Sequence, residues 1–209
     1  MKKADWIWFD NKMVPWQDAT THVLSHTLHY GGGAFEGIRF YKTPNGSAIF
    51  RLIEHVERLF YSCSILGLEL NYSKLEIETA IKETIVKNKL SEGYIRPLAF
   101  WGEGNLRIIS NDLPVHLIIA TWPLGNYLPC DCVDVKVSDF IRIHPNSTVT
   151  DAKLCGHYVN SIISSLNLKN TKYHESLLLD YAGNIAEGPG VNFFCVIDEV
   201  LLTPKLGNI

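Results

Sequence analysis

The sequence has no long hydrophobic run. No apolar stretch in its 209 residues approaches the roughly 20 residues that a transmembrane helix needs. Met1-Lys2-Lys3 resembles the start of a signal peptide, but Asp5 and Asp10 interrupt any apolar region that would follow. The sequence therefore predicts a protein with no membrane partner and no secretion signal.

Clusters of basic residues and metal-binding patterns are missing too. The formal net charge is −3 and no Lys/Arg cluster stands out, so we expect no nucleic-acid partner. The five cysteines are odd in number and scattered, which favours free thiols in a cytoplasmic protein. Cys130-Asp131-Cys132 has no second Cys/His pair at ligand spacing, and we therefore predict no metal site.

The chain does have the composition of an ordinary folded protein and enough length for two small domains. Hydrophobic residues make up 46% and charged residues 20%, and no repeat is present. Pro123 to Pro129 breaks the pattern of regular elements and suggests a domain boundary. We predict a smaller α+β domain at 1–122, a linker at 123–132, and part of a second domain at 133–209.

Hydrophobic periodicity predicts the elements of these domains. In the first domain we expect hairpins at 6–16 and 37–50, helices at 52–66 and 73–88, and strands at 94–101 and 115–121. Ser73 and Glu76 form a capping box at the start of the second helix. In the second domain we expect a helix at 158–167 and strands at 133–137, 176–180 and 193–197, with one more strand near the end. This mixture indicates an α+β fold.

Two local patterns stand out in the first domain. The helix at 52–66 has an apolar stripe and also a polar stripe of His55, Arg58 and Ser62, spaced i, i+3, i+7. Gly31-Gly32-Gly33 allows the backbone to approach another surface closely. This run lacks the strand-then-helix setting of a phosphate loop, so we do not interpret it as one.

Lys153 is the first candidate for chemistry. It precedes a predicted helix, and its small and apolar neighbours could provide the desolvation that a Schiff-base lysine requires. Tyr158 follows five residues later and can lie over the same region. Glu187 ends a predicted strand before Gly188-Pro189-Gly190 and could face a cation such as a pyridinium nitrogen. The structural alternatives are a solvated lysine, a core tyrosine and a solvated loop glutamate.

Two arginines are further candidates. Arg58 lies off the apolar stripe of its helix, and its planar guanidinium suits a phosphate group. Arg96 lies in the strand-like run Tyr94-Ile95-Arg96-Pro97, where it could receive a substrate carboxylate or form a structural ion pair. Taken singly, each of these candidate residues also fits a purely structural role.

Taken in order, the motifs resemble those of a known family. They are Tyr30-Gly31, Phe35-Glu36-Gly37-Ile38-Arg39, His55-Val56-Glu57-Arg58-Leu59, Tyr94-Ile95-Arg96-Pro97, Lys153 with Tyr158, and Glu187-Gly188-Pro189-Gly190-Val191-Asn192. Together they are similar to the branched-chain amino acid aminotransferases, which are two-domain enzymes of fold type IV that use pyridoxal 5′-phosphate (PLP). The resemblance extends over the whole chain.

The resemblance implies a role for each candidate in cofactor binding. Lys153 resembles the catalytic lysine that binds PLP covalently and moves the proton of the substrate Cα. Tyr158 resembles the phenol that binds the cofactor O3′, and Glu187 the partner of the pyridine nitrogen. Arg58 resembles a ligand of the phosphate.

The resemblance also implies a substrate pocket. The expected substrates are Leu, Ile or Val in one half-reaction and glutamate or 2-oxoglutarate in the other, with a homodimer or higher homo-oligomer as the working form. The implied substrate-binding residues are Phe35, Gly37 and Tyr127 as pocket walls, Tyr30 across a dimer interface, and Tyr94 with Arg96 for a carboxylate.

One departure from the family limits this prediction. Members normally continue past the position of Ile209, with a Gly-Ile-Thr turn for the phosphate and a Thr-Ala pair for the α-carboxylate. We therefore expect the second domain to be incomplete, and the 209 residues alone to bind PLP weakly and transaminate poorly or not at all. The alternatives are a D-amino acid aminotransferase, an aminodeoxychorismate lyase, and a non-catalytic scaffold. The first two would share Lys153 and Glu187 but not the Tyr94–Pro97 context.

Overall fold

The computed structural model describes residues 3–109, 112–125 and 132–206, which form two compact units. Unit 1 comprises Met1–Gly125 together with Ala152–Gly156, and unit 2 comprises Asn126–Asp151 with His157–Ile209. The short segment around Lys153 thus packs with the N-terminal part of the chain. The division into domains at 123–132 stays a prediction.

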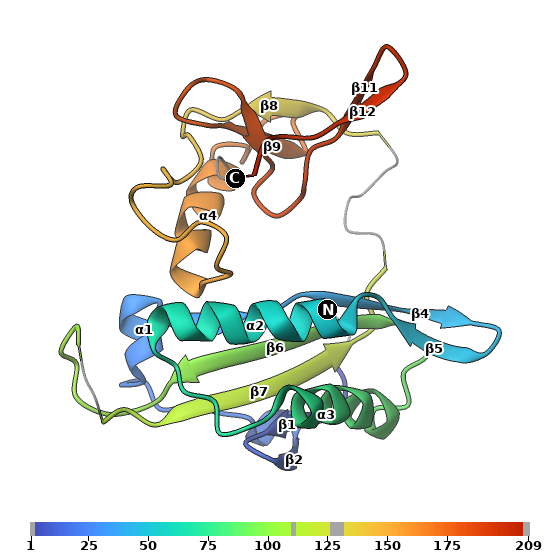
Figure 1. The fold of residues 1–209 in the computed structure, drawn as a ribbon, viewed down its shortest axis with the longest axis vertical. Helices are drawn as coiled ribbons and strands as arrows, with labels where there is room; N and C mark the ends of the chain where they lie inside the picture. Colours follow the sequence, from blue (N-terminus) through green and yellow to red (C-terminus); the bar gives the residue numbers. More distant parts are fainter. Residues whose placement is uncertain (1–2, 110–111, 126–131, 207–209) are drawn as a thin grey trace. The chain divides into compact units, whose positions relative to one another are not determined.

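Unit 1 is built on a seven-stranded antiparallel sheet (Figure 1). Six strands follow the order β2-β1-β7-β6-β4-β5, and β3 also pairs with β6. The strand bounds are β1 Trp6–Phe9, β2 Lys12–Pro15, β3 Gly33–Phe35, β4 Ile38–Thr43, β5 Gly46–Ile49, β6 Gly93–Trp101 and β7 Val115–Trp122. The two predicted hairpins and the two predicted strands of this unit are confirmed.

The sheet is interrupted between β3 and β4, within the motif Phe35-Glu36-Gly37-Ile38-Arg39. Both strands pair with β6, and between them the Glu36 N–H donates to the Pro97 carbonyl at 3.0 Å. Proline has no N–H to return that hydrogen bond, so the ladder cannot continue there. The interruption lies beside Glu36 and Gly37.

Two long helices cover the sheet. α2 (Leu52–Leu66) packs near β3, and α3 (Lys74–Lys87) packs near β1 and β7. Figure 1 shows both helices lying along the sheet. The apolar stripe of α2 enters the core with the buried side chains Val56, Leu59 and Cys63. Both helices were predicted, and the capping box at the start of α3 is confirmed. Two short elements, the 3₁₀ turn Trp16–Asp18 and α1 (His26–Tyr30), were not predicted.

Unit 2 contains a small mixed sheet with one helix against it. β8 (Val135–Val137) pairs in parallel with β9 (Glu175–Leu179), which pairs antiparallel with β10 (Ile185–Glu187). α4 (Tyr158–Leu166) follows a 3₁₀ turn at Cys155–His157 and contacts β9. β11 (Cys195–Ile197) and β12 (Val200–Leu202) form a separate hairpin. The predicted α4 and β9 are confirmed within one residue at each end.

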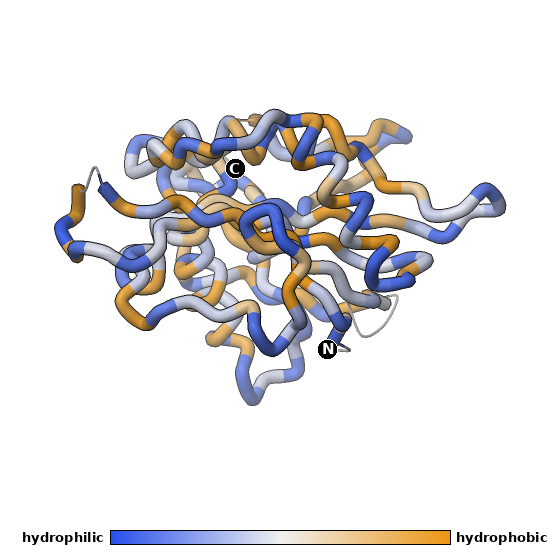
Figure 2. Tube along the Cα trace, turned by 90° about the horizontal axis from the view of Figure 1, so that it is seen from below, coloured by the Kyte–Doolittle hydropathy of each residue, from blue (hydrophilic) through white to orange (hydrophobic). Residues whose placement is uncertain are grey.

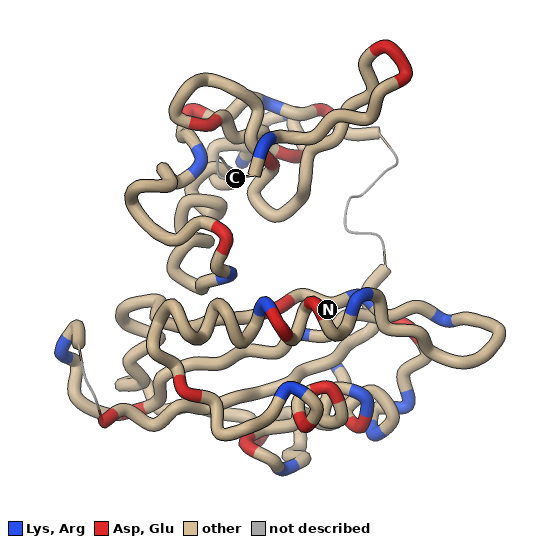
Figure 3. The backbone as a smooth tube through the Cα atoms, in the orientation of Figure 1, with Lys and Arg blue, Asp and Glu red and all other residues tan. Residues whose placement is uncertain are grey.

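Charged residues of both signs occur along the described parts of both units. Hydrophobic and hydrophilic segments alternate along the chain (Figure 2), and acidic and basic residues are interspersed along both long helices of unit 1 (Figure 3). Among the helices of the described ranges, none has the length and apolar character required to cross a membrane.

Candidate active site

The backbone of Lys153 is fixed on both sides. Its N–H donates to the Ser62 hydroxyl at 2.9 Å, and its carbonyl accepts from the Phe35 N–H at 3.1 Å. The flanking Ala152 and Leu154 are buried in the core of unit 1. Residues of α2 and β3 therefore hold the candidate lysine in place.

The glycine run provides the close approach that the sequence predicts. The Gly156 N–H donates to the Gly31 carbonyl at 3.0 Å, and a Cβ on Gly31 would lie 2.9 Å from the Gly156 Cα. Gly31 also has φ +69°, a conformation that favours glycine. The Lys153 segment thus docks against this run because the glycines carry no side chains.

Three predicted residues meet around the Phe35 ring. The Arg96 guanidinium carbon lies 4.5 Å from the ring centroid, and the Lys153 ammonium nitrogen lies 5.2 Å from it. Both distances are in the range of cation–π interactions. Lys153, Phe35 and Arg96 come from three separate stretches, and the fold brings them together within unit 1.

Gly37 and Tyr94 form the adjoining part of this cluster. A Cβ built on Gly37 would lie 1.9 Å from the Tyr94 hydroxyl oxygen, so only glycine leaves room for this tyrosine. The Tyr94 hydroxyl in turn accepts from Arg96 Nη2 at 3.3 Å. The predicted pocket residues Phe35 and Gly37 therefore contact Arg96 and Tyr94, the predicted carboxylate-binding pair.

Arg96 has a buried donor that no described residue satisfies. Its Nε atom is buried and lacks a hydrogen-bond partner within the described part of the chain. An unsatisfied buried donor is costly, and an acceptor from a ligand would remove that cost. This arrangement suits the binding of a carboxylate beside Phe35.

Sequence reasoning missed the residue that Arg58 binds. Arg58 donates from Nε and Nη2 to the two carboxylate oxygens of Glu36, at 2.5 and 2.8 Å, and His55 Nδ1 donates at 2.8 Å. The Glu36 side chain is completely buried. The polar stripe of α2 was the available signal, since His55 and Arg58 on one helix face point to a shared acidic partner.

Cys155 also borders this cluster. A Cβ on Gly33 would lie 3.1 Å from its sulfur. Burial raises the pKa of the Cys155 thiol, although the nearby Arg96 charge acts in the opposite direction. The thiol is therefore protonated at neutral pH and is a poor nucleophile. Within the residues that the structure describes, no group of three or more His, Cys, Asp or Glu side chains could hold a metal ion.

In unit 2, Glu187 lies at the end of β10 and is bound by an arginine. Arg142 Nε donates to the Glu187 carboxylate, and the two side chains are 13% and 23% exposed. The Arg142 N–H donates to the Leu179 carbonyl at 2.8 Å, which ties this arginine to β9. Glu187 is therefore paired with Arg142, a partner that sequence reasoning missed, and its pairing with a pyridinium nitrogen stays a prediction.

Tyr158 and the Glu187 run border one shallow pocket of unit 2. Tyr158 begins α4, and Pro189 and Gly190 line the same pocket. The pocket has a volume of about 430 Å³. The structure thus brings the phenol-bearing helix and the Gly-Pro-Gly turn together within this unit.

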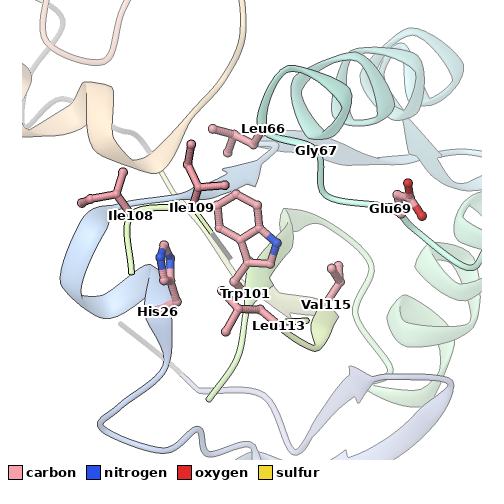
Figure 4. A pocket seen from close by; sticks show the side chains of 9 residues that line it. All are labelled: His26, Leu66, Gly67, Glu69, Trp101, Ile108, Ile109, Leu113 and Val115. Atoms are coloured by element: carbon pink, nitrogen blue, oxygen red, sulfur yellow. The ribbon is translucent and has the colours of Figure 1, made fainter. Parts of the chain in front are cut away.

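The remaining candidates lie elsewhere. Tyr30 ends α1, is 45% exposed, and donates from its hydroxyl to the Leu106 carbonyl at 2.8 Å. Tyr127 lies outside the described residues. A second pocket of about 520 Å³ surrounds Trp101 in unit 1 (Figure 4). It contains none of the predicted site residues; its lining is His26, Leu66, Gly67, Glu69, Trp101, Ile108, Ile109, Leu113 and Val115.

The chain matches a model of a known protein family. The α+β fold and the cluster of Lys153, Arg96 and Phe35 agree with that family. Residues 33–209 match the model described as amino-transferase class IV. The chain belongs to the class IV aminotransferase family, and the expected fold type IV is confirmed.

Three similar proteins carry the name branched-chain amino acid aminotransferase. A branched-chain-amino-acid aminotransferase of Pseudomonas aeruginosa is 43% identical over 204 residues, which is 96% of this chain and 66% of the relative. A crystal structure of the Escherichia coli branched-chain amino acid aminotransferase matches with TM-score 0.92 and 39% identity, over 99% of this chain and 69% of that one. The Thermobaculum terrenum branched-chain amino acid aminotransferase in its PLP form matches with TM-score 0.89 and 26% identity, over 100% and 70%.

These alignments also show a difference in length. The chain spans about two thirds of the curated relatives that it matches, while nearly all of its own residues are aligned. The expectation that family members are longer than this sequence is confirmed.

Proposed function

We propose that the protein is a PLP-dependent aminotransferase that exchanges amino groups between branched-chain L-amino acids and 2-oxoglutarate. The observation that carries this proposal is the cluster in unit 1 where Lys153, Arg96 and Phe35 meet. An amine, a carboxylate-binding arginine and an apolar ring are the groups that such a substrate requires. The name shared by the relatives supports the branched-chain assignment.

The residues present fit PLP as a cofactor. In unit 1, Lys153 has the amine for covalent attachment, and Arg58 keeps 45% of its side chain exposed for an anion. In unit 2, Glu187 is an acidic partner for a ring nitrogen, and Tyr158 has a phenol for O3′. When bound, PLP would supply an electron sink for the charge that develops at the substrate Cα.

Residues of unit 1 would transfer the proton, orient the substrate carboxylate and contact the substrate side chain. Lys153 would remove and return the proton at the substrate Cα, which requires a general base close to that atom. Arg96 and Tyr94 would orient a carboxylate, since a guanidinium binds this group through paired donors. Phe35 would pack against a branched side chain, and Gly37 leaves the space that Tyr94 occupies.

We also propose a homodimer or higher homo-oligomer in the cytoplasm. Apolar side chains are exposed on α1 and near residue 108, including Leu28 at 63% and Ile108 at 73%. Exposed apolar groups of this kind mark interaction surfaces. Tyr30 lies in the same region and would reach a neighbouring copy. Sedimentation analysis tests this, and a strictly monomeric protein would contradict it.

The function is tested by absorbance and by product formation. The purified chain is mixed with PLP, and we expect a visible absorbance band that Lys153→Ala abolishes and that the exposed control Lys74→Ala retains. Glutamate formation from 2-oxoglutarate is then measured with Leu, Ile and Val as L- and D-enantiomers. A preference for D-amino acids would favour a D-amino acid aminotransferase. Absence of the band in the wild-type protein would favour a non-catalytic scaffold.

A further inference from the structure

Glu36 is an unusually enclosed carboxylate. Its side chain is 0% exposed, and it accepts four hydrogen bonds, two from Arg58 and one each from His55 and the Gly37 N–H. A buried charge is tolerated only when it is paired and hydrogen-bonded. Both carboxylate oxygens are satisfied, so Glu36 forms a fixed anchor inside unit 1.

The Arg58–Glu36 contact pairs two opposite charges and also fixes the orientation of the Arg58 guanidinium. The Nε and Nη2 atoms bind the two carboxylate oxygens as a fork, which sets the plane and the rotation of the guanidinium. The edge that carries Nη1 therefore faces away from Glu36. Glu36 is fully buried while the Arg58 side chain is 45% exposed, so the exposed part of the pair belongs to Arg58.

The same helix holds the candidate lysine. Ser62 lies one turn after Arg58 on α2 and accepts the Lys153 N–H at 2.9 Å. Arg58 is thus oriented on the helix that also anchors the backbone of Lys153. A long arginine side chain loses much rotamer freedom when it binds an anion, and an arginine already held in place loses less.

We propose that Glu36 is a positioning residue that fixes the guanidinium of Arg58 for the phosphate group of the cofactor. This inference rests on the proposed function, in which Arg58 is a phosphate ligand. Glu36 itself does not touch the phosphate, since its two oxygens are directed at Arg58, His55 and Gly37.

Three possible roles of Glu36 predict different changes in cofactor binding when Glu36 is replaced. If Glu36 only stabilised the fold, its loss would weaken the binding of every cofactor form equally. If only the local charge mattered, Glu36→Gln would strengthen phosphate binding, because it removes a negative charge beside Arg58. Positioning predicts a loss that is specific to the phosphate.

The test compares PLP with pyridoxal, which lacks the phosphate. Dissociation constants for both are measured by absorbance titration of the 209-residue chain as wild type, Glu36→Gln and Glu57→Gln. Glu57 lies on the same helix in an exposed ion pair with Lys74 and is the matched control. We expect Glu36→Gln to weaken PLP binding about 10-fold and to leave pyridoxal binding within about 2-fold. An equal loss for both ligands, or tighter PLP binding, would overturn the proposal.

A second variant keeps the test decisive if Glu36→Gln does not fold. Arg58→Lys retains the positive charge but cannot form the fork with Glu36. We expect it to lose most of the preference for PLP over pyridoxal, and a wild-type preference in this variant would overturn the proposal. A wild-type chain that binds neither ligand would instead overturn the proposed function and this inference with it. A chain that binds both equally would refute the phosphate role of Arg58 and this inference with it, while leaving the attachment of the cofactor at Lys153 standing.

Discussion

The hydroxyl of Ser62 accepts the backbone N–H of Lys153 at 2.9 Å and joins two residues that are 91 positions apart in sequence. Ser62 belongs to the polar stripe of α2, whose other members, His55 and Arg58, bind Glu36. The apolar stripe of the helix, beside the polar one, lies in the core of unit 1. One helix therefore ties the candidate lysine and the candidate phosphate ligand to the packing of the unit.

Replacing Ser62 tests this connection. Ser62→Ala leaves the Lys153 N–H without its acceptor in a partly buried setting, so we expect a loss of about 1–2 kcal/mol in the free energy of unfolding. Ser64→Ala is the matched control, because Ser64 lies on the same helix but is exposed. Urea denaturation measures both variants, and we expect the control to change by less than about 0.5 kcal/mol. Equal effects would show that Ser62 does not anchor the lysine.

Gly37→Ala tests the space beside Tyr94. The new Cβ would lie 1.9 Å from the Tyr94 hydroxyl oxygen and 2.8 Å from the ring carbon that bears it. Tyr94 must then move, and we expect a destabilisation of about 1–3 kcal/mol. The double variant with Tyr94→Phe, which removes the nearest atom, should recover part of that loss in thermal melts. Gly125→Ala is the control, since a Cβ there meets nothing within 4 Å.

The acid stability of the protein depends on Glu36. Burial alone would raise its pKa, but the hydrogen bonds and charges of Arg58 and His55 hold the pKa below the ordinary value of 4.5. A carboxyl group whose pKa is lower in the folded state adds stability above its unfolded pKa. This stability is lost as the pH falls below 4.5 through the folded pKa.

We therefore expect the wild type to lose stability more steeply below this pH than Glu36→Gln, which has no titrating group at position 36. Urea denaturation over a pH series measures the two slopes, with Glu57→Gln as a control that should follow the wild type. Parallel curves for wild type and Glu36→Gln would contradict the prediction.

Local patterns in the sequence predicted the long elements well. The helix at 52–66 has the predicted limits because its apolar residues repeat every three or four positions, and the capping box correctly marked the start of α3. The three-residue strand β3 was missed because a glycine run has no alternating pattern, and its pairing is set by β6 instead. α1 has only five residues, too few for a helical period to appear.

The two acidic contacts could not be predicted in the same way. Glu36 meets His55 and Arg58 across 19 and 22 residues, and Arg142 meets Glu187 across 45. The fold determines such partners. The polar stripe of α2 indicates that His55 and Arg58 share an acidic partner, but it does not identify Glu36, and Arg142 has no comparable local signal. Lys153 and Glu187 were named from motifs, whereas the residues that hold them, Ser62 and Arg142, became visible only in the structure.

The Arg142–Glu187 ion pair gives a last prediction, for unit 2. Arg142→Ala keeps the backbone bond to Leu179 but leaves a mostly buried carboxylate without its guanidinium. We expect unfolding to become easier by about 1–3 kcal/mol, less than for a fully buried pair, because both side chains retain some exposure.

A double variant and a control make this prediction specific. Arg142→Ala with Glu187→Gln should be more stable than Arg142→Ala alone, since no charge is then left unpaired. Lys136→Ala breaks an exposed ion pair with Asp139 at 3.6 Å in the same unit, and we expect a change below about 0.5 kcal/mol. Urea denaturation of the wild type, the single variants Arg142→Ala and Glu187→Gln, and the double variant completes the cycle, with Lys136→Ala measured beside them. If the double variant is no more stable than Arg142→Ala, the arginine stabilises unit 2 through packing and not by pairing with Glu187.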